Sequence, residues 1–231
     1  MLRSFVPRHE IKFFLSATDA IWLSSRLSAA LDRDRNAGPD GAYLVRSLYL
    51  DDAYDSAFYD KIAGSPSRDK YRIRLYNLDD RMILLERKRK LGDLIQKESA
   101  QISRRMAERV VLGDPSGFEK VENQLVRDLF REMRTKLMRP VVLVDYTREA
   151  FCHPAENARV TIDRMLRAGP RTGLFDPDVP TVPALDVDQA ILEVKFDRVL
   201  PSEIAQLLWN APASRSAISK YVACRRYEPL R

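Results

Sequence analysis

The sequence has 231 residues, of which 45% are hydrophobic and 31% are charged, so the chain can bury a sizeable core and carries a polar surface. This composition excludes an intrinsically disordered chain and a collagen-like fibre. The formal net charge is +6, from 39 basic and 33 acidic side chains, and this mild excess favours an anionic partner without choosing between nucleic acid, nucleotides and membrane headgroups.

Alternating strands dominate the first half of the chain. Short runs in which apolar and polar residues alternate are typical of half-buried strands. Five such runs occur: Arg8–Leu15, Tyr43–Asp52, Lys70–Asn77, Arg81–Lys90 and Leu94–Ser103. Short turns join the last three into an antiparallel meander. A short helix is expected at Ser56–Ile62.

The first predicted helix follows the first strand. Ser16 or Thr18 is expected to cap its N-terminus, because short hydroxyl side chains accept hydrogen bonds from the first turn. Its apolar stripe is expected to comprise Ile21, Trp22, Leu27 and Leu31. The stretch Asn36–Gly41 that follows has the composition of a loop.

The second half mixes helices and strands. A helix is expected from a Ser103 cap to Gly113, and a longer one over residues 117–137 ends before Pro140. The apolar stripe of the longer helix comprises Val121, Leu125, Leu129, Met133 and Leu137. Three further strands are predicted at Val141–Cys152, Ala158–Leu166 and Ala190–Asp197. The Pro- and Gly-rich stretch 169–186 is expected to be a loop, and two short helices, 201–210 and 216–227, complete the chain.

These elements amount to eight strands with amphipathic helices, and no internal repeat or long linker divides them. We therefore expect one domain over residues 1–231. The cysteines Cys152 and Cys224 and the histidines His9 and His153 have no metal-binding spacing, so free buried thiols in a reducing compartment are expected. The N-terminus lacks the apolar core of a signal peptide, and no apolar run approaches the ~20 residues that span a bilayer. A soluble, cytoplasmic protein is expected.

Strand parity collects the charged side chains on one face of most strands. These faces carry Arg8, Glu10 and Lys12; Lys70, Arg72 and Arg74; Glu86, Lys88 and Lys90; Lys97, Ser99 and Gln101; Tyr146 and Arg148; Arg159, Thr161 and Asp163; and Glu193, Lys195 and Asp197. Arg87 and Arg89 charge the opposite face of their strand. An ordinary solvent-facing side of an antiparallel sheet is one interpretation. The bias toward Arg and Lys favours another, because ordinary exposed faces mix signs.

In that second interpretation, helices cover the apolar side of the sheet and the charged side faces inward. About eight strands can close into a barrel with a lumen. A lumen lined by like charges is tolerable only when water and a polyanion fill it, and arginine forks fit phosphate oxygens. Glu10, Glu86 and Glu193 lie among these cations and either pair with them or hold a divalent cation such as Mg²⁺ or Mn²⁺. The chain contains neither a Walker A loop nor a kinase-type glycine-rich loop.

Seven motifs in order carry a family resemblance: "RHEIKF", "KYRIRLYN", "LLERKRK…QKES", "DYTREAF", "ARVTIDRML", "LEVKFD" and "SKYVAC". Over about Arg8 to Arg226 the chain resembles the VTC domain, the polyphosphate polymerase domain of the vacuolar transporter chaperone complex. That family belongs to the triphosphate tunnel metalloenzymes, whose wider group includes CYTH-type triphosphatases and adenylate cyclases. The resemblance implies an α+β fold in which an antiparallel eight-stranded β-barrel tunnel carries amphipathic helices on its outside.

The resemblance also implies roles for individual residues. Catalytic roles would fall to Arg72, Arg74, Lys88, Arg148 and Arg159. Substrate would contact Lys12, Lys97, Tyr146, Ser219 and Lys220. The metal would bind to Glu193, on the last strand, and to Glu10, in the "ExK" pattern of the first. Unlike the vacuolar members, this sequence shows no membrane segment and no SPX-type regulatory domain.

The leading expectation is a polyphosphate polymerase that uses a divalent metal, Mn²⁺ or Mg²⁺. It would transfer the terminal phosphoryl group of ATP or another nucleoside triphosphate to a growing polyphosphate chain. One alternative is a hydrolase of triphosphate or short polyphosphate with the same fold. A second is a polyphosphate-binding module without catalysis. Nucleic acid is not an expected partner, because aromatic residues make up only 9% of the chain and no stacking platform is evident.

Overall fold

A computed structural model describes residues 9–92, 94–116, 121–209, 214–215 and 217–227. The strands within these residues are β1 (His9–Ser16), β2 (Asp32–Arg33), β3 (Ala42–Asp51), β4 (Ser67–Tyr76), β5 (Asp79–Leu91), β6 (Leu94–Ile102), β7 (Arg139–His153), β8 (Ala158–Gly169), β9 (Val182–Pro183), β10 (Gln189–Phe196) and β11 (Ser214–Arg215). The helices are α1 (Ala17–Ala30), α2 (Ser56–Ile62), α3 (Arg104–Val111), α4 (Gln124–Thr135), a single 3-10 turn η1 (Ala155–Asn157), α5 (Ser202–Trp209) and α6 (Lys220–Arg225). The fold is therefore α+β, as predicted.

The strand order corrects the predicted barrel. Hydrogen bonds connect the strands in the order β11-β1-β10-β8-β7-β3-β4-β5-β6, with β2 beside β7 and β9 beside β8. Eleven strands take part within the described residues rather than eight, because three two-residue strands were too short to leave an alternating pattern in the sequence. Over the same residues the order has two ends, β11 and β6, so the sheet is antiparallel as predicted but is not a closed eight-stranded barrel.

The chain divides into two compact units. Unit 1 takes its described residues from Met1–Leu44, Tyr146–Leu166 and Leu185–Ser219. Unit 2 takes its described residues from Val45–Asp145, Arg167–Ala184 and Lys220–Arg231. Strands β3, β7 and β8 contribute residues to both units, and the expectation of a single domain stays a prediction.

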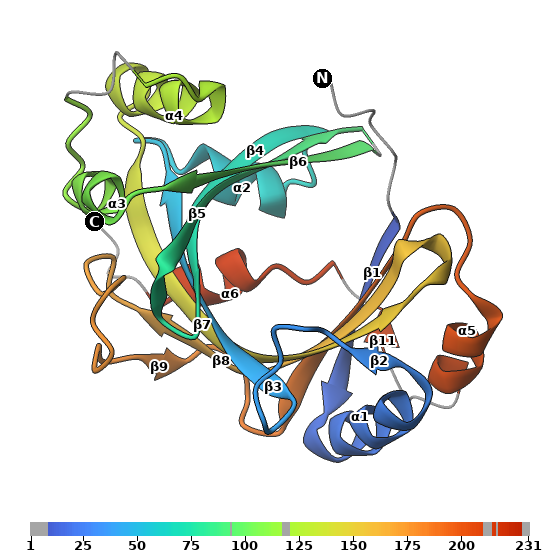
Figure 1. The fold of residues 1–231 in the computed structure, drawn as a ribbon. Coiled ribbons are helices and arrows are strands. Elements are labelled where there is room, and N and C mark those ends of the chain that lie inside the picture. Colours follow the sequence, from blue (N-terminus) through green and yellow to red (C-terminus); the bar gives the residue numbers. More distant parts are fainter. Residues whose placement is uncertain (1–8, 93, 117–120, 210–213, 216, 228–231) are drawn as a thin grey trace. The chain divides into compact units, whose positions relative to one another are not determined.

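Unit 1 is built around the antiparallel pairing of β1, β10 and β8. In this register Lys12 lies opposite Glu193, and Glu193 lies opposite Thr161. Helices α1 and α5 lie beside each other and pack on these strands (Figure 1). The core between them contains apolar side chains of the helices and of the strands, among them Leu23, Leu27, Val160, Leu192 and Ile204. Alternation along each strand then leaves the polar side chains on the other face.

Helix α1 confirms one prediction and corrects another. Ser16 is the N-cap, and its hydroxyl accepts a hydrogen bond from the Asp19 amide at 3.0 Å. The buried face consists of Ala20, Leu23, Ser24 and Leu27. Ile21 and Trp22, which were expected in the buried stripe, are 66% and 44% exposed. Ala20, Leu23 and Leu27, which are spaced i, i+3 and i+7, face the sheet. Ile21 and Trp22 lie outside this series and are therefore exposed.

Unit 2 is built on the predicted meander of β4, β5 and β6. Asn77 and Leu78 connect β4 to β5, and both have positive φ, which is the geometry of a two-residue type I′ turn. Helices α3 and α4 cover the same side of the β5–β6 hairpin (Figure 1). Their apolar faces pack on the strands and form a core that includes Ile73, Leu85 and Leu129.

Helix α4 is shorter than predicted. It begins after an Asn123 cap, whose side chain accepts from the Val126 amide at 3.3 Å, and it ends at Thr135. Residues 117–120 of the predicted helix lie outside the described residues. Leu125, Leu129 and Met133 are buried as expected, whereas Leu137 is 63% exposed and has positive φ beyond the helix. The Ser103 cap of α3 is confirmed by its contact with the Met106 amide.

Two expectations about compartment and chemistry have simple outcomes. Among the described residues, no helix has both the length and the apolar character needed to cross a membrane. Cys152 and Cys224 form no disulfide within the described residues, and of the two only Cys224 is buried. Burial raises the pKa of Cys224 to about 12, so this thiol stays protonated and unreactive at neutral pH.

Candidate phosphate-binding and metal-binding clusters

Unit 2 gathers three cations around one buried carboxylate. Glu86 on β5 is only 2% exposed and lies opposite Arg72 on β4. Its Oε2 is 2.6 Å from Nε of Arg72 and 3.7 Å from NH1 of Arg74, and its Oε1 contacts the ammonium of Lys97 on β6. We call Arg72, Arg74, Lys97 and Glu86 the cationic cluster, because three positive charges share one negative charge.

The charge states follow from this arrangement. Burial alone would raise the pKa of Glu86, but Arg72, Arg74 and Lys97 together hold it well below its usual range. Burial lowers the pKa of Lys97 below its ordinary value, and the attraction of Glu86 offsets only part of this shift. Arg72 and Arg74 therefore outweigh the ionised Glu86 by one positive charge, and a protonated Lys97 adds a second, which suits an anionic ligand.

Strand β3 supports the two arginines. Tyr49 lies opposite Arg72, and its hydroxyl oxygen accepts a hydrogen bond from Arg72 NH1 at 3.0 Å. Ser47 lies opposite Arg74, and its hydroxyl accepts from Arg74 Nε at 3.0 Å. Burial would raise the pKa of Tyr49, but Arg72 and Arg74 lower it. Sequence reasoning missed Ser47 and Tyr49, although their alternation along one strand was a usable signal.

Helix α6 brings Lys220 to unit 2. The ring of Tyr221 stacks on Tyr49 with centroids 5.1 Å apart, and its hydroxyl donates to Asp51 Oδ2 at 2.5 Å. Arg225 pairs with Asp55 at 2.7 Å. Lys220 is among the charges that lower the pKa of Tyr49, so its ammonium acts on the same neighbourhood as Arg72. Ser219, the half-buried residue before it, is the last residue of the third segment of unit 1.

Unit 1 contains a different cluster, in which charges balance. Lys12 Nζ lies 2.8 Å from Glu10 Oε1 and 3.3 Å from Glu193 Oε2. Lys195 Nζ contacts Glu193 Oε1 and lies 3.9 Å from Glu10 Oε2. Burial would lower the pKa of Lys12, but Glu193 and Glu10 raise it above the ordinary lysine value. We call Glu10, Lys12, Glu193 and Lys195 the balanced cluster.

The other predicted residues of unit 1 also have carboxylate partners. Arg148 is buried and makes two parallel hydrogen bonds to Asp163, at 2.6 and 2.7 Å, while its guanidinium lies over the ring of Tyr146. Arg159 pairs with Asp34 at 2.6 Å and donates to the hydroxyl of Tyr43 at 2.9 Å. Asp34 and Tyr43 were missed, because a sequence does not reveal which strands become neighbours.

Oxygen donors for a hard cation exist in the balanced cluster. No three His, Cys, Asp or Glu side chains of the described residues converge as a ready metal centre. Glu10 and Glu193 nevertheless reach the same two ammonium groups, so their carboxylates lie near one another. Thr161, opposite Glu193, is 3% exposed, and its hydroxyl oxygen is buried without a hydrogen-bond partner. Two carboxylates and an unsatisfied hydroxyl fit Mg²⁺ or Mn²⁺.

The predicted residues are thus distributed over both units. Unit 2 holds Arg72, Arg74, Lys88, Lys97 and Lys220, and unit 1 holds Glu10, Lys12, Tyr146, Arg148, Arg159, Glu193 and Ser219. Within unit 2, Arg72, Arg74 and Lys97 converge on Glu86, and Lys88 lies directly opposite Lys97. Within unit 1, Lys12 meets Glu10 and Glu193.

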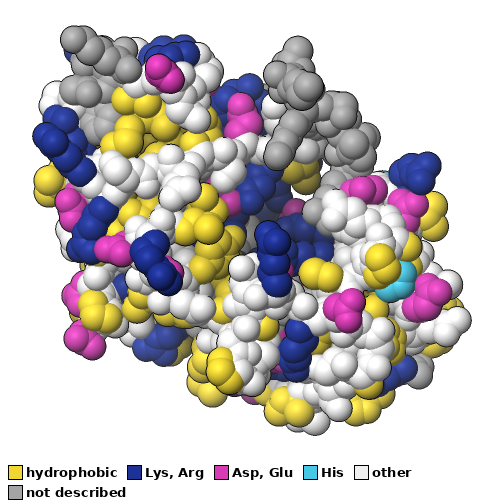
Figure 2. Space-filling view, in the orientation of Figure 1, with side chains coloured by type: hydrophobic (Ala, Val, Ile, Leu, Met, Phe, Trp, Pro, Cys, Tyr) yellow, Lys and Arg dark blue, Asp and Glu magenta, His cyan; other side chains and the backbone are white. Residues whose placement is uncertain are grey.

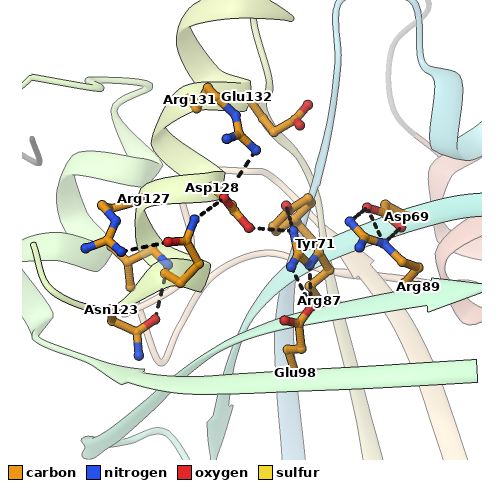
Figure 3. Close-up of polar contacts among 12 residues, drawn as sticks. Asp69, Tyr71, Arg87, Arg89, Glu98, Asn123, Arg127, Asp128, Arg131 and Glu132 are labelled. Carbon is orange, nitrogen blue, oxygen red and sulfur yellow. Dashed lines mark hydrogen bonds and ion pairs between the residues drawn. The ribbon is translucent and has the colours of Figure 1, made fainter. Parts of the chain in front are cut away.

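The opposite face of β5 has a structural role. Arg87 donates to Tyr71 and Asp128 at 2.9 Å each and pairs with Glu98 at 2.6 Å, which ties α4 to the hairpin (Figure 3). Arg89 pairs with Asp69 at 2.8 Å. These arginines are therefore engaged by acids on the helix-covered side. Figure 2 shows basic and acidic side chains mixed over much of the visible surface.

Comparison with known proteins identifies the family of this chain. The model of a family described as the VTC domain matches residues 7–227. A search of curated proteins finds no match.

Among solved structures, one of a candidate adenylate cyclase from Bacillus halodurans has a TM-score of 0.53 at 13% identity, covering 90% of this chain and 88% of that one. A conserved hypothetical protein from Pyrococcus furiosus has a TM-score of 0.49 at 10% identity, covering 94% of this chain and 99% of that one. A chain of the Schizosaccharomyces pombe Mediator head module has the same score and identity, covering 90% and 100%. The Bacillus halodurans match shows a shared fold.

Proposed function

Because the chain belongs to the VTC domain family, we propose that it is an enzyme acting on nucleotide and polyphosphate substrates, and specifically a metal-dependent polyphosphate polymerase. The observation that carries this proposal is the cationic cluster, where Arg72, Arg74 and Lys97 share the single buried carboxylate of Glu86. Arginine forks bind phosphate oxygens in pairs, and a lysine adds a point charge. We expect the enzyme to act in the cytoplasm.

The reaction needs positioning more than covalent help. An oxygen of the terminal phosphate of the growing chain attacks the γ-phosphorus of ATP. The bond between the γ-phosphorus and the bridging oxygen breaks, ADP leaves with the electron pair, and the chain gains one phosphate. Phosphoryl transfer of this kind depends on in-line alignment and on cancelling charge at the equatorial oxygens. No serine, cysteine or histidine nucleophile is required, because the acceptor phosphate is the nucleophile.

The chain's own residues divide these tasks. Arg72 and Arg74 are preorganised by Glu86, Tyr49 and Ser47, so they bind phosphate oxygens with little reorganisation. Lys88, Lys97 and Lys220 add charge beside them. In unit 1, Arg148, held by Asp163, and Arg159 are proposed as further phosphate ligands, with Tyr146 packed against Arg148. Lys12 and Ser219 are proposed as additional substrate contacts.

The balanced cluster is proposed to hold the divalent metal. Glu193 and Glu10 would be its carboxylate ligands, and Thr161 could add a hydroxyl oxygen. When bound, Mg²⁺ or Mn²⁺ supplies neutralisation of phosphate charge. Lys12 and Lys195 form ion pairs with the same two carboxylates.

One incubation tests the proposal. The protein is mixed with ATP labelled at the γ-position and Mn²⁺, and products are separated on a gel. A polymerase yields a ladder of lengthening polyphosphate together with ADP. Free phosphate without polymer indicates the hydrolase instead, and binding of polyphosphate without any turnover indicates a binding module. Arg81→Met serves as a control, because Arg81 is exposed and pairs only with Asp79 at the β5 start among the described contacts.

A further inference from the structure

A groove lies in unit 2 where helices α3 and α4 end and strand β7 begins. Its volume is about 470 Å³, which is within the range of pockets that bind small molecules. The apolar part of its lining includes Val111 and Leu112 at the end of α3, Met133 of α4, and Leu137 and Met138 between α4 and β7. All of these residues belong to unit 2, so the groove lies within one compact unit.

The charged side chains at the groove are basic. Arg139 begins β7 and Arg171 lies in the loop after β8, and the described lining contains no aspartate or glutamate. For the described residues, neither arginine forms an ion pair, and Arg139 Nε is buried without a hydrogen-bond partner. By contrast, Arg46 and Arg87 of the same unit each have an acid, at 2.8 and 2.9 Å. A carboxylate bound at Arg139 would supply the missing acceptor through two parallel hydrogen bonds.

Two leucines of the groove are exposed. Leu112 is 80% exposed, and Leu137 is 63% exposed with a φ of 53°, a left-handed conformation that is unfavourable for a leucine. Helix α4 uses this conformation to end, because the Met138 amide bonds back to the Glu132 carbonyl at 3.3 Å. Glycine adopts it without strain, as Gly113 does after α3. A leucine that is neither buried nor relaxed favours a role in contact with a ligand.

We propose that this groove binds a small amphipathic carboxylate. The apolar body of the ligand packs on Leu112, Leu137 and Met133, and its head group pairs with Arg139, with Arg171 adding charge from the loop. Methionine side chains adapt their shape, so apolar bodies of different form fit the same lining. The groove shares no residue with the cationic cluster, and the inference is therefore independent of the proposed function.

The two arginines also have a structural explanation. The last carbonyls of a helix carry partial negative charge, and basic side chains near them are stabilising. If Arg139 only complemented the ends of α3 and α4, Arg139→Met would lower thermal stability and leave ligand binding unchanged. A ligand site predicts the reverse. The variant removes a buried donor that has no partner, so stability is kept while binding is lost.

Three probes separate the parts of the ligand, and calorimetry measures their binding to the whole chain. Octanoate has an anionic head and an apolar tail, acetate has only the head, and octanol has only the tail. Arg139→Met and Leu137→Asn each remove one contact of the protein. Their matched controls in unit 2 are Arg81→Met, at an exposed arginine, and Leu91→Asn, at an exposed leucine. Thermal unfolding reports the stability of each variant, and a further titration of octanoate contains excess inorganic triphosphate.

We expect octanoate to bind the wild-type protein with a Kd below about 1 mM, and acetate and octanol to bind at least about tenfold more weakly. Arg139→Met should weaken octanoate binding by about tenfold, the worth of one charge-assisted hydrogen bond. Leu137→Asn should weaken it by about threefold or more, because part of the apolar contact is lost. In both variants the midpoint of thermal unfolding should be unchanged or raised, and the two controls should bind octanoate as the wild type does.

Several results would overturn the inference. They are no binding of octanoate, binding of octanol as tight as that of octanoate, and unchanged octanoate binding by Arg139→Met. Displacement of octanoate by triphosphate would also overturn it, because the ligand would then occupy the cationic cluster. None of these measurements depends on turnover of ATP, so this inference and the proposed polymerase succeed or fail separately.

Discussion

The cationic cluster of unit 2 and the balanced cluster of unit 1 use the same residue types on the same kind of strand, yet they differ in charge balance. In unit 2, Arg72, Arg74 and Lys97 converge on the carboxylate of Glu86. In unit 1, Lys12 and Lys195 face two carboxylates, those of Glu10 and Glu193. Surplus positive charge attracts an anion, whereas we propose that the carboxylates paired with ammonium groups exchange them for a metal ion.

We infer from this comparison that the local charge balance of each cluster, rather than the overall charge of +6, determines whether the cluster suits an anion or a cation. Nearby arginines in unit 1 follow the same rule. Arg148 and Arg159 each have an acid of their own, Asp163 and Asp34, so they add little net charge there. The following four tests probe this difference, from the largest expected effect to the smallest.

The strongest test removes a guanidinium from the cationic cluster. Arg72→Met should lower kcat/KM for ATP-dependent polymer formation by about 10²- to 10³-fold, because a preorganised donor to the transferring phosphoryl group is lost. Steady-state kinetics measures the loss, and Arg81→Met is the control. A loss of less than about tenfold would show that the cationic cluster is not the main phosphate ligand.

The second test exchanges one carboxylate in each cluster for its neutral isostere. Glu193→Gln should weaken Mn²⁺ binding by at least about tenfold, because it removes a proposed ligand. Glu86→Gln should leave Mn²⁺ affinity unchanged, because Glu86 is engaged by three cations. Calorimetric or EPR titration with Mn²⁺ alone gives both affinities. Equal losses in the two variants would abolish the distinction between the clusters.

The third test uses pH on the cationic cluster. Burial lowers the pKa of Lys97, and Glu86, Arg72 and Arg74 are the charges that face it, with Tyr76 nearby. In the free protein, Lys97 should lose its proton at a lower pH than an ordinary lysine does. Triphosphate affinity should therefore begin to fall at that lower pH, and it should be about tenfold weaker once Lys97 is neutral. Lys97→Arg keeps its charge and should have a flatter profile. Identical profiles for the two proteins would contradict the assignment.

The smallest effect concerns the buried hydroxyl of the balanced cluster. Thr161→Val preserves shape and removes only an oxygen without a hydrogen-bond partner. Mn²⁺ affinity should fall by about two- to tenfold, the worth of one neutral contact, while the free energy of unfolding changes by less than about 1 kcal/mol. If metal affinity is unchanged and the protein becomes more stable, Thr161 has no part in metal binding.

Periodicity predicted the strands well because alternation reports directly on which face is buried. The meander at Lys70–Asn77, Arg81–Lys90 and Leu94–Ser103 was recovered with boundaries shifted by a few residues. The common face of Arg72, Arg74 and Lys97 also followed from parity. Helix α1 was harder, since Ala20 and Ser24 are small and did not mark the buried face that Leu23 and Leu27 define.

Partners from distant segments could not be predicted in the same way. Asp34 meets Arg159, and Tyr49 meets Arg72, only because particular strands become neighbours. Parity fixes the face of a residue but not the strand that it will lie beside, nor the register of that pairing. For the same reason the sequence predicted an inward face biased toward Arg and Lys, whereas the structure also places buried acids beside four of these arginines, Arg72, Arg74, Arg148 and Arg159.

The pairing of β1 with β10 has a consequence for the order in which the chain assembles. Strand β1 (His9–Ser16) forms hydrogen bonds with β10 (Gln189–Phe196). It can therefore pair only after a segment near the other end of the sequence has reached the sheet. The hairpins of β4, β5 and β6 join neighbours in the chain and close short loops, which is entropically cheaper and faster. In pulse-labelling hydrogen exchange during refolding, we expect amides of β5 to gain protection before those of β1. The β4–β6 meander of unit 2 would then be formed before β1 joins the sheet of unit 1.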